Sequence, residues 1–370
     1  MRILFLTDSD SPHTIRWVKA MHELGHSIAL FCIHSINTSL YKDTSDIFLY
    51  SSEINRNVQG KGEVSVSKIK YLFSIGKIKK IIRSFNPDIV HAHYASSYGL
   101  LAVLTKFKPV IVSFWGSDVF IFPKKSLLHR LIIIYVSKNA DKLLSTSNIM
   151  KVEIQKYSNK PITVIPFGVD LKKFAPSEKI LSNKQNVVIG IIKTLEENYG
   201  IRYLIEAFAL LKKKYTDKAF KLLIVGKGSQ REVLEKIVRN YDIEKEVEFT
   251  GYIDPQEIHK YHQQIDICVI PSISESFGVS AVEAMACGKP VIASNVGGLA
   301  EVIDHEKTGI LVEPKNSDAI FKALDEMIIN KEYRIILGNA AREKVSKIYN
   351  WDNSVQLMND VYKKVVKYKI

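Results

Sequence analysis

The sequence predicts an α/β fold made of two doubly wound, Rossmann-like domains with parallel sheets. The first observation is length, because 370 residues exceed the ~250–300 at which a single hydrophobic core usually stops growing. The second is an alternation of short apolar runs with segments of helical periodicity, which favours parallel strands joined by right-handed crossovers. The third is that this alternation pauses near the middle of the chain and then begins again.

The first half contains apolar runs that we expect to form strands buried on both faces, separated by amphipathic helices. The expected strands are Ile3–Leu6, Ser27–Phe31, Ile89–His91, Val110–Ser113 and Lys142–Ser145. The expected helices lie around Ile15–Leu24, residues 67–87, Leu100–Thr105 and Leu127–Lys138.

The second half repeats the pattern after a joint at residues 164–182, where Pro166 and Pro176 flank a polar stretch. The expected strands are Asn186–Ile192, Lys221–Val225, Val247–Phe249 and Ile265–Ile270, and the expected helices are Ile201–Tyr215, Glu232–Asn240 and Pro255–Gln263. We therefore expect a first domain over residues 1–168, a second over 169–350, and a final helix within 351–370.

Composition indicates an ordered globular protein, with 46% hydrophobic and 25% charged residues. The three cysteines lie in or beside apolar runs without paired spacing, so we expect small core residues in a reducing compartment. The chain begins with a strand-like segment, and no run of about 18 uncharged apolar residues follows. These features predict a cytoplasmic location.

Positive charge is concentrated in the first half of the chain. The net charge is +13; residues 1–170 hold 22 Lys and Arg against 12 Asp and Glu, and residues 171–370 hold 30 against 27. Within the first half, residues 67–87 place basic side chains among isoleucines and phenylalanines, and residues 123–135 form a second basic and apolar segment. Two interpretations stay open for residues 67–87: a peripheral contact with anionic lipid, or a surface helix packed on the sheet.

The basic side chains of the first of these segments are Lys68, Lys70, Lys77, Lys79, Lys80 and Arg83. A sequence pI of about 9.3 also raises the hypothesis of a non-enzymatic binder of nucleic acid or lipid. Because no recognisable nucleic-acid module accompanies the charge, we do not expect nucleic acid as a partner.

The most informative segment is residues 271–301, PSISESFGVSAVEAMACGKPVIASNVGGLAE. Glu275 lies in the loop after an expected strand, and Glu283 lies on the small-residue helix that begins after Gly278. The amino terminus of such a helix, with unpaired N–H groups and a partial positive charge, can bind a diphosphate. Two glutamates are ordinarily solvated surface charges, but this context predicts a nucleotide-sugar site.

This segment resembles the Glu-x7-Glu motif of the retaining glycosyltransferases of family 4, which have the GT-B fold. The resemblance implies that Glu275 contacts hydroxyls of the donor sugar and that Glu283 holds the ribose of the nucleotide. It also implies two domains that face a central cleft, and a last helix that crosses back to the first domain. Pro166 to Asp170 is similar to the family's interdomain segment, with Phe167 where Asn is commoner.

The resemblance also indicates which residues hold the diphosphate of the donor. Lys193 lies at a strand end where the family usually has Arg, and Tyr199 lies where a Lys is usual. Lys193 keeps a charge without the bidentate geometry of Arg. Arg202, one helical turn further, can substitute for the missing cation, or it can serve only on the surface.

The resemblance implies further donor-binding residues, whose backbone would lie beside the nucleotide or the sugar. They are Gly226, in a Gly-x-Gly turn that is weak evidence by itself, Ile253 beside the base, and Phe277, Gly278 and Val279 at the start of the helix that carries Glu283.

On the acceptor side, Trp115-Gly116-Ser117-Asp118 is similar to a His-Gly-x-Asp segment of the family, with Trp115 in place of the usual His. We expect Asp118 to orient acceptor or donor, and the alternative is that it caps a helix or turn. His93 and His13 are expected in the cleft, and His91 in the core. No third ligand at metal spacing accompanies the histidines, so we expect no zinc.

The resemblance implies a metal-independent, retaining transfer in which the leaving phosphate oxygen helps to deprotonate the incoming hydroxyl. Glu275, Lys193 and Asp118 are the expected catalytic residues, and no cofactor is expected beyond the nucleotide-sugar cosubstrate. Asp8-Ser9-Asp10 fits a metal-binding D-x-D pattern of another fold, but we interpret it as a turn. The acceptor is expected to be a glycan or a lipid-linked saccharide, and the donor a UDP-sugar. The alternative is a sugar-nucleotide epimerase or glycosyl phosphorylase on the same fold.

Overall fold

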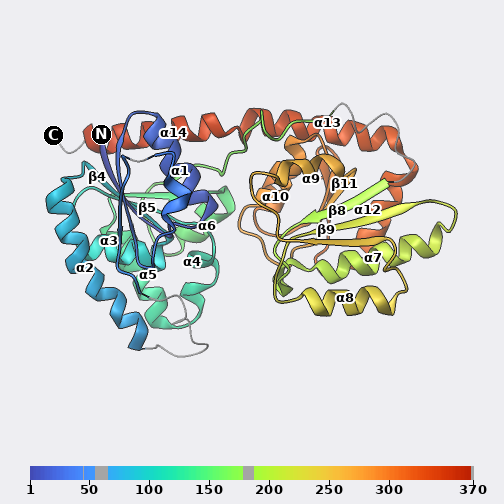
Figure 1. Cartoon of the computed structure of the whole chain (residues 1–370), viewed down its shortest axis with the longest axis horizontal. Helices are drawn as coiled ribbons and strands as arrows, with labels where there is room; N and C mark the ends of the chain where they lie inside the picture. Colours follow the sequence, from blue (N-terminus) through green and yellow to red (C-terminus); the bar gives the residue numbers. More distant parts are fainter. Residues whose placement is uncertain (45, 55–65, 178–186, 368–370) are drawn as a thin grey trace. The chain divides into compact units, whose positions relative to one another are not determined.

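The computed structural model describes residues 1–44, 46–54, 66–177 and 187–367, without the side chains of residues 66–70. The chain divides into two compact units, shown in Figure 1. The first unit combines Met1–Pro166 with the residues from Ser354 onward, and the second is Phe167–Asn353. Parts of the expected joint (178–182) and of the expected last helix (368–370) lie outside the described residues.

In the first unit the strands are β1 (Arg2–Leu6), β2 (Ser27–Cys32), β3 (Phe48–Ser51), β4 (Ile89–His93), β5 (Val110–Ser113), β6 (Lys142–Ser145) and β7 (Ile162–Val164). The α-helices between them are α1 (Pro12–Glu23), α2 (Val66–Phe85), α3 (Leu100–Leu104), α4 (Ser117–Phe120), α5 (Leu127–Asn139) and α6 (Asn148–Gln155).

In the second unit the strands are β8 (Val187–Ile192), β9 (Phe220–Val225), β10 (Val247–Gly251), β11 (Ile267–Ile270), β12 (Val291–Ser294) and β13 (Gly309–Val312). The α-helices are α7 (Ile201–Lys214), α8 (Arg231–Asn240), α9 (Ile258–Gln264), α10 (Val279–Ala286), α11 (Leu299–Val302), α12 (Ser317–Ile329) and α13 (Lys331–Ile348). The last helix, α14 (Trp351–Lys367), begins in the second unit and continues into the first.

Each unit is built on one parallel sheet among the described residues. The strand order is β3-β2-β1-β4-β5-β6-β7 in the first unit and β10-β9-β8-β11-β12-β13 in the second. The predicted fold class, two doubly wound parallel-sheet domains, is confirmed. The direction of winding reverses between β1 and β4 and between β8 and β11, and ligands of such sheets bind outside the carboxyl ends of strands at this switch point.

Two strands of the first sheet, the edge strands β3 and β7, were not expected from the sequence. The edge strand β3 is four residues long and only partly buried, and it pairs in parallel with β2. Such a short segment lacks the continuous apolar run by which a buried strand is identified.

Successive side chains of a strand point to opposite faces of the sheet, so the core of the first unit has two sides. Val90 and Ala92 of β4 pack in the cluster formed with α2, α3 and α5, whereas His91 between them points to the opposite side, where α14 lies. The buried face of α2 includes Ile78, Ile81 and Phe85. This packing fits the interpretation of residues 67–87 as a surface helix.

The side chains of Lys68 and Lys70 lie outside the described part of α2. All three cysteines are buried and free, as predicted for small core residues. In the part of the chain that the structure describes, no helix is both long enough and apolar enough to cross a membrane.

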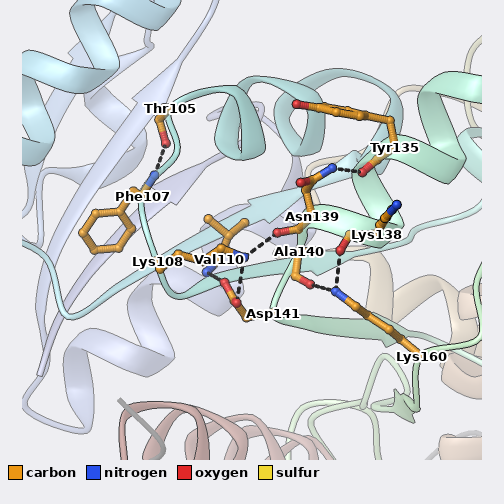
Figure 2. Close-up of polar contacts among 10 residues, drawn as sticks. All are labelled: Thr105, Phe107, Lys108, Val110, Tyr135, Lys138, Asn139, Ala140, Asp141 and Lys160. Atoms are coloured by element: carbon orange, nitrogen blue, oxygen red, sulfur yellow. Dashed lines mark hydrogen bonds and ion pairs between the residues drawn. The ribbon is translucent and has the colours of Figure 1, made fainter. Parts of the chain in front are cut away.

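The carbonyl end of α5 is held by two lysines from outside the helix (Figure 2). Lys160 Nζ donates to the carbonyls of Lys138, at 2.7 Å, and Ala140. Lys108 Nζ donates to the carbonyl of Asn139 and to Asp141, each at 2.8 Å. A helix carboxyl terminus leaves its last carbonyls unpaired and partly negative, so these cations stabilise the turn from α5 into β6.

Helix α14 joins the first unit through buried polar contacts. The hydroxyl of Tyr362, which is fully buried, lies 2.6 Å from His91 Nδ1, and Ser113 Oγ lies 2.8 Å from His91 Nε2. A second contact joins His26 Nε2 to Asn359 Oδ1 at 3.0 Å. Burial lowers the pKa of His91 to about 3, because the charged form is poorly solvated in the core.

We predict that Tyr362→Phe destabilises the first unit by about 1–3 kcal/mol, because it leaves a buried ring nitrogen of His91 without its partner. Urea unfolding followed by the fluorescence of Trp17 and Trp115, both in this unit, measures the effect. The neighbouring exposed residue supplies the control, since Lys363→Ala should change stability by less than about 0.5 kcal/mol. Equal stability of the two variants would contradict the prediction.

Candidate functional site

The second unit brings two of the predicted catalytic residues into contact. Lys193 follows β8 and Glu275 follows β11, and these two strands are neighbours at the switch point. Lys193 Nζ donates to Glu275 Oε2 at 2.5 Å, and both side chains are mostly buried. The pair therefore places a cation and a carboxylate outside the carboxyl ends of the central strands.

Two further side chains hold this pair. Lys193 Nζ lies 4.4 Å from the centre of the Tyr199 ring, within range of a cation–π interaction. Ser272 Oγ donates to Glu275 Oε2 at 3.4 Å. Tyr199, which is a departure from the family pattern, thus contacts the ammonium group of Lys193 with its ring.

Glycines allow the backbone to approach both residues. Gly226 has a φ of 140°, and a Cβ added there would lie 1.9 Å from the carbonyl oxygen of Lys193. Gly297 has a φ of 47°, and a Cβ there would lie 1.9 Å from the carbonyl oxygen of Glu275. Any larger residue would push these loops away from the strand ends.

The start of α10 lies directly after Glu275 in the chain. Gly278, with a φ of 103°, is the N-cap, and Val279 is the first helical residue. Phe277 is buried, and its ring packs edge-on against the rings of Phe167 and Tyr349. The backbone N–H groups of this first turn have no partner within the helix, so they can bind an anion.

Glu283 lies on the second turn of α10 with its carboxylate partly exposed. Its Oε2 is 3.2 Å from Nε2 of His262, a fully buried residue of α9. The sequence did not single out His262, because it lies in a short polar helix without a motif.

The other predicted donor-side residues lie in the same unit. Arg202, on the first turn of α7, forms an ion pair with Glu206 at 3.3 Å. Gly226 donates its N–H to the carbonyl of Gly251, two residues before the half-buried Ile253. The structure thus brings Lys193 and Glu275 into contact, whereas Arg202 has its ion pair on the surface of its own helix.

The first unit brings three predicted acceptor-side residues together. The Trp115 ring lies 4.3 Å from the ring of His93 and 5.9 Å from that of His13, measured between centroids. Tyr94, with a φ of 68°, adds a ring at 5.5 Å. His93 ends β4, Trp115 follows β5, and His13 lies at the start of α1, the helix after β1, so the group lies near the switch point of the first sheet.

His93 is oriented by a short hydrogen-bond chain. Its Nδ1 lies 3.0 Å from Thr7 Oγ1, which lies 2.7 Å from Thr14 Oγ1. Burial lowers the pKa of His93 well below its ordinary value, and the nearby His91 and His13 act in the same direction. Both effects favour the uncharged form of the His93 ring.

Asp118 is fully buried, and both of its carboxylate oxygens accept backbone hydrogen bonds. Oδ2 accepts from Ala95 N at 2.9 Å, and Oδ1 accepts from Gly116 N at 2.8 Å and Trp115 N at 3.2 Å. Burial raises its pKa, and these hydrogen bonds oppose the rise. These hydrogen bonds tie the loop of Trp115 to the loop after β4.

The D-x-D segment forms a local turn, in which Asp8 Oδ1 accepts from Asp10 N at 3.2 Å. Among the described residues, no group of three or more His, Cys, Asp or Glu is arranged to hold a metal ion.

Comparison with known proteins connects both units to one family. Residues 173–344 match the family described as glycosyl transferases group 1, and residues 2–147 match that described as glycosyl transferase 4-like. An uncharacterized glycosyltransferase of Methanocaldococcus jannaschii is 32% identical over 302 residues, which are 80% of this chain and 81% of that protein.

Two solved structures share the fold across almost the whole chain. Sucrose-phosphate synthase from Thermosynechococcus elongatus has a TM-score of 0.84 at 21% identity and covers 100% of both chains. HepE of Anabaena, in complex with UDP, has a TM-score of 0.81 at 17% identity and covers 98% of this chain and 100% of its own. These likenesses confirm the expected GT-B fold class. The family matches and the relative from Methanocaldococcus jannaschii establish that the chain belongs to the glycosyl transferases group 1, the glycosyltransferase family 4 that its Glu-x7-Glu segment resembles.

Proposed function

We propose that the protein is a retaining, metal-independent glycosyltransferase that moves a sugar from a UDP-sugar to a glycan or lipid-linked saccharide. The product would belong to a cell-surface polysaccharide or glycoconjugate. The observation that carries the proposal is the contact between Lys193 and Glu275 beside the amino terminus of α10. The UDP bound to HepE, a structure with the same fold, supports the choice of uridine.

In this proposal the second unit binds the donor. Glu275 accepts hydrogen bonds from hydroxyls of the sugar, while Lys193 and the N–H groups that follow Gly278 meet the charge that grows on the departing diphosphate. An ammonium group has three donors, so Lys193 can bind Glu275 and a phosphate oxygen together. The leaving oxygen, held on the same face of the sugar as the incoming hydroxyl, takes its proton, and configuration is retained.

The first unit supplies the acceptor side. In this proposal the acceptor approaches the group formed by His13, His93 and Trp115, of which His93 and Trp115 are buried and His13 is partly exposed. Asp118 acts in this proposal by fixing the Trp115 loop, because both of its oxygens already accept backbone hydrogen bonds.

We also propose that the first unit contacts anionic lipid through the outer face of α5, at the cytoplasmic side of the cell membrane. Leu127 is 71% exposed, and Leu128, Leu131 and Tyr135 are exposed beside it. Lys125 and Arg130 are exposed in the same segment. Apolar side chains flanked by cations are the chemistry that an anionic membrane surface recognises.

The exposed residues of α2 add to this proposed lipid contact. Phe73 is 79% exposed, next to the exposed Leu72. The apolar residues that follow Phe73 in α2 are buried or partly buried, so the contribution of this helix would rest on Leu72 and Phe73.

For the donor site, we predict that UDP at ~100 times its dissociation constant stabilises the protein by about 2.7 kcal/mol, with or without EDTA. Glu275→Gln should keep this stabilisation and should lower the turnover of the UDP-sugar about 100-fold, because it removes charge beside the reacting sugar. A thermal-shift panel of UDP, GDP, ADP and CMP, followed by a transfer assay, measures both effects.

The matched control is Glu257→Gln, an exposed carboxylate on the same unit that pairs with Lys260. It should leave turnover unchanged. A stabilisation that requires Mg²⁺ would contradict metal independence, and wild-type turnover in Glu275→Gln would remove the assigned role of that residue.

For the lipid contact, we predict that replacing Leu127, Leu128 and Leu131 by Ser lowers binding to phosphatidylglycerol vesicles at least about tenfold. The reason is that burial of each leucine contributes roughly 1.5–3 kcal/mol. Vesicle co-sedimentation measures the bound fraction. The control exchanges Ile335 and Ile336, exposed on α13 of the second unit, for Ser. Equal binding by both variants would refute the lipid contact.

A further inference from the structure

His262 is a buried side chain for which the proposed mechanism has no role. It lies on α9, between β10, whose end borders Ile253, and β11, whose end leads to Glu275. The ring is fully buried and lies 5.8 Å from the Phe174 ring. Its neighbour Gln263 fixes the end of α9, because the Gln263 side chain donates to the carbonyl of Ala175 and its own carbonyl accepts from Lys289.

The contact with Glu283 determines which ring nitrogen carries hydrogen. A carboxylate only accepts hydrogen bonds, so Nε2 donates to Glu283 Oε2 across 3.2 Å. The other nitrogen, Nδ1, is buried without a hydrogen-bond partner among the described residues. A hydrogen on Nε2 therefore has a partner, whereas a hydrogen on Nδ1 would be a buried N–H group without one, which is costly.

The hydrogen bond orients the Glu283 carboxylate. With Oε2 held by a rigid buried ring, Oε1 is the oxygen that is left to accept from a ligand. A glutamate on a helix surface otherwise samples several rotamers, and fixing one in advance reduces the entropy lost on binding. Side chains that hold a ligand-binding group in this way commonly contribute to affinity without touching the ligand.

We propose that His262 is a positioning residue for the ribose of the donor nucleotide: it holds Glu283 so that Oε1 accepts from a ribose hydroxyl. The proposal rests on the proposed function, in which Glu283 takes the ribose. It makes the nucleotide site selective for a ligand with ribose hydroxyls. Sites built to bind a hydroxyl reject analogues that lack it, because their own polar group is then left unpaired.

The test compares UDP with 2′,3′-dideoxy-UDP by isothermal titration calorimetry. Wild type should bind UDP at least tenfold more tightly than the dideoxy analogue. His262→Leu should weaken UDP about tenfold and leave the dideoxy analogue unchanged, because only UDP uses the oriented carboxylate. His262→Gln, whose amide nitrogen can reach the position of Nε2, should restore most of the affinity for UDP.

The same helix offers a matched control. His259 also packs near Phe174, at 6.3 Å between ring centroids, and also has a buried Nδ1 without a partner among the described residues. His259→Leu should therefore leave both affinities unchanged. If His262→Leu does not fold, His262→Asn replaces it: its shorter amide cannot reach Glu283, so it should behave differently from His262→Gln.

The outcomes separate this inference from the function on which it rests. Equal weakening of both ligands in His262→Leu or His262→Asn, without rescue by Gln, would show a packing role only and overturn the inference. Glu283→Ala should abolish the preference for UDP over its dideoxy analogue. If that preference survives in Glu283→Ala, or if UDP does not bind wild type, the ribose role of Glu283 fails, and the role of His262 fails with it. If Glu283→Ala loses the preference and His262→Leu keeps it, only the inference fails.

Discussion

The parallel pairing of β8 with β11 is the constraint on which the candidate donor site depends. These strands are neighbours, although Lys193 and Glu275, which follow them, are 82 residues apart in sequence. Because parallel strands place their carboxyl ends at one edge of the sheet, a cation after one strand meets a carboxylate after the other. Tyr199 and Ser272, from the same two connections, then restrict where the two charged groups can lie.

The close approach of these strand connections also requires glycine, which has no side chain. Gly226 and Gly297 allow one strand connection to touch another at positions where a Cβ would overlap a carbonyl oxygen. The first unit achieves a comparable arrangement by different means, since the buried carboxylate of Asp118 ties two loops together through backbone N–H groups. The loops near both switch points are therefore in close contact, one set through glycines and the other through a buried polar residue.

Much of the fold could be predicted because buried parallel strands are apolar on both faces and stand out as short continuous runs. The strand β3 escaped this signal, since an edge strand of four partly buried residues has no such run. Glu275 and Glu283 were identified from a long motif that resembles a family. His262 could not be identified in this way. Its contact with Glu283 joins residues 21 apart and depends on the packing of α9 on α10, which nothing local in the sequence encodes.

The partners of two predicted site residues, Asp118 and Arg202, could be identified only from contacts in the structure. Both oxygens of Asp118 are taken by the backbone, which sequence cannot distinguish from a carboxylate that faces a ligand. Arg202 has an acidic partner one helical turn away, at Glu206. The family's motif supplies the type of residue at a position, whereas the partner of each side chain depends on tertiary packing.

The contact between His91 and Tyr362 has a consequence for biosynthesis. The two residues are 271 positions apart, and the whole second unit lies between them in the sequence. At ~5–20 residues per second, a ribosome needs roughly 14–54 s to advance from one to the other. Once β7 has been made, the nascent first unit has all the strands of its sheet but not the helix that covers His91. A polar ring of the future core then faces solvent or a chaperone while the second unit is being made.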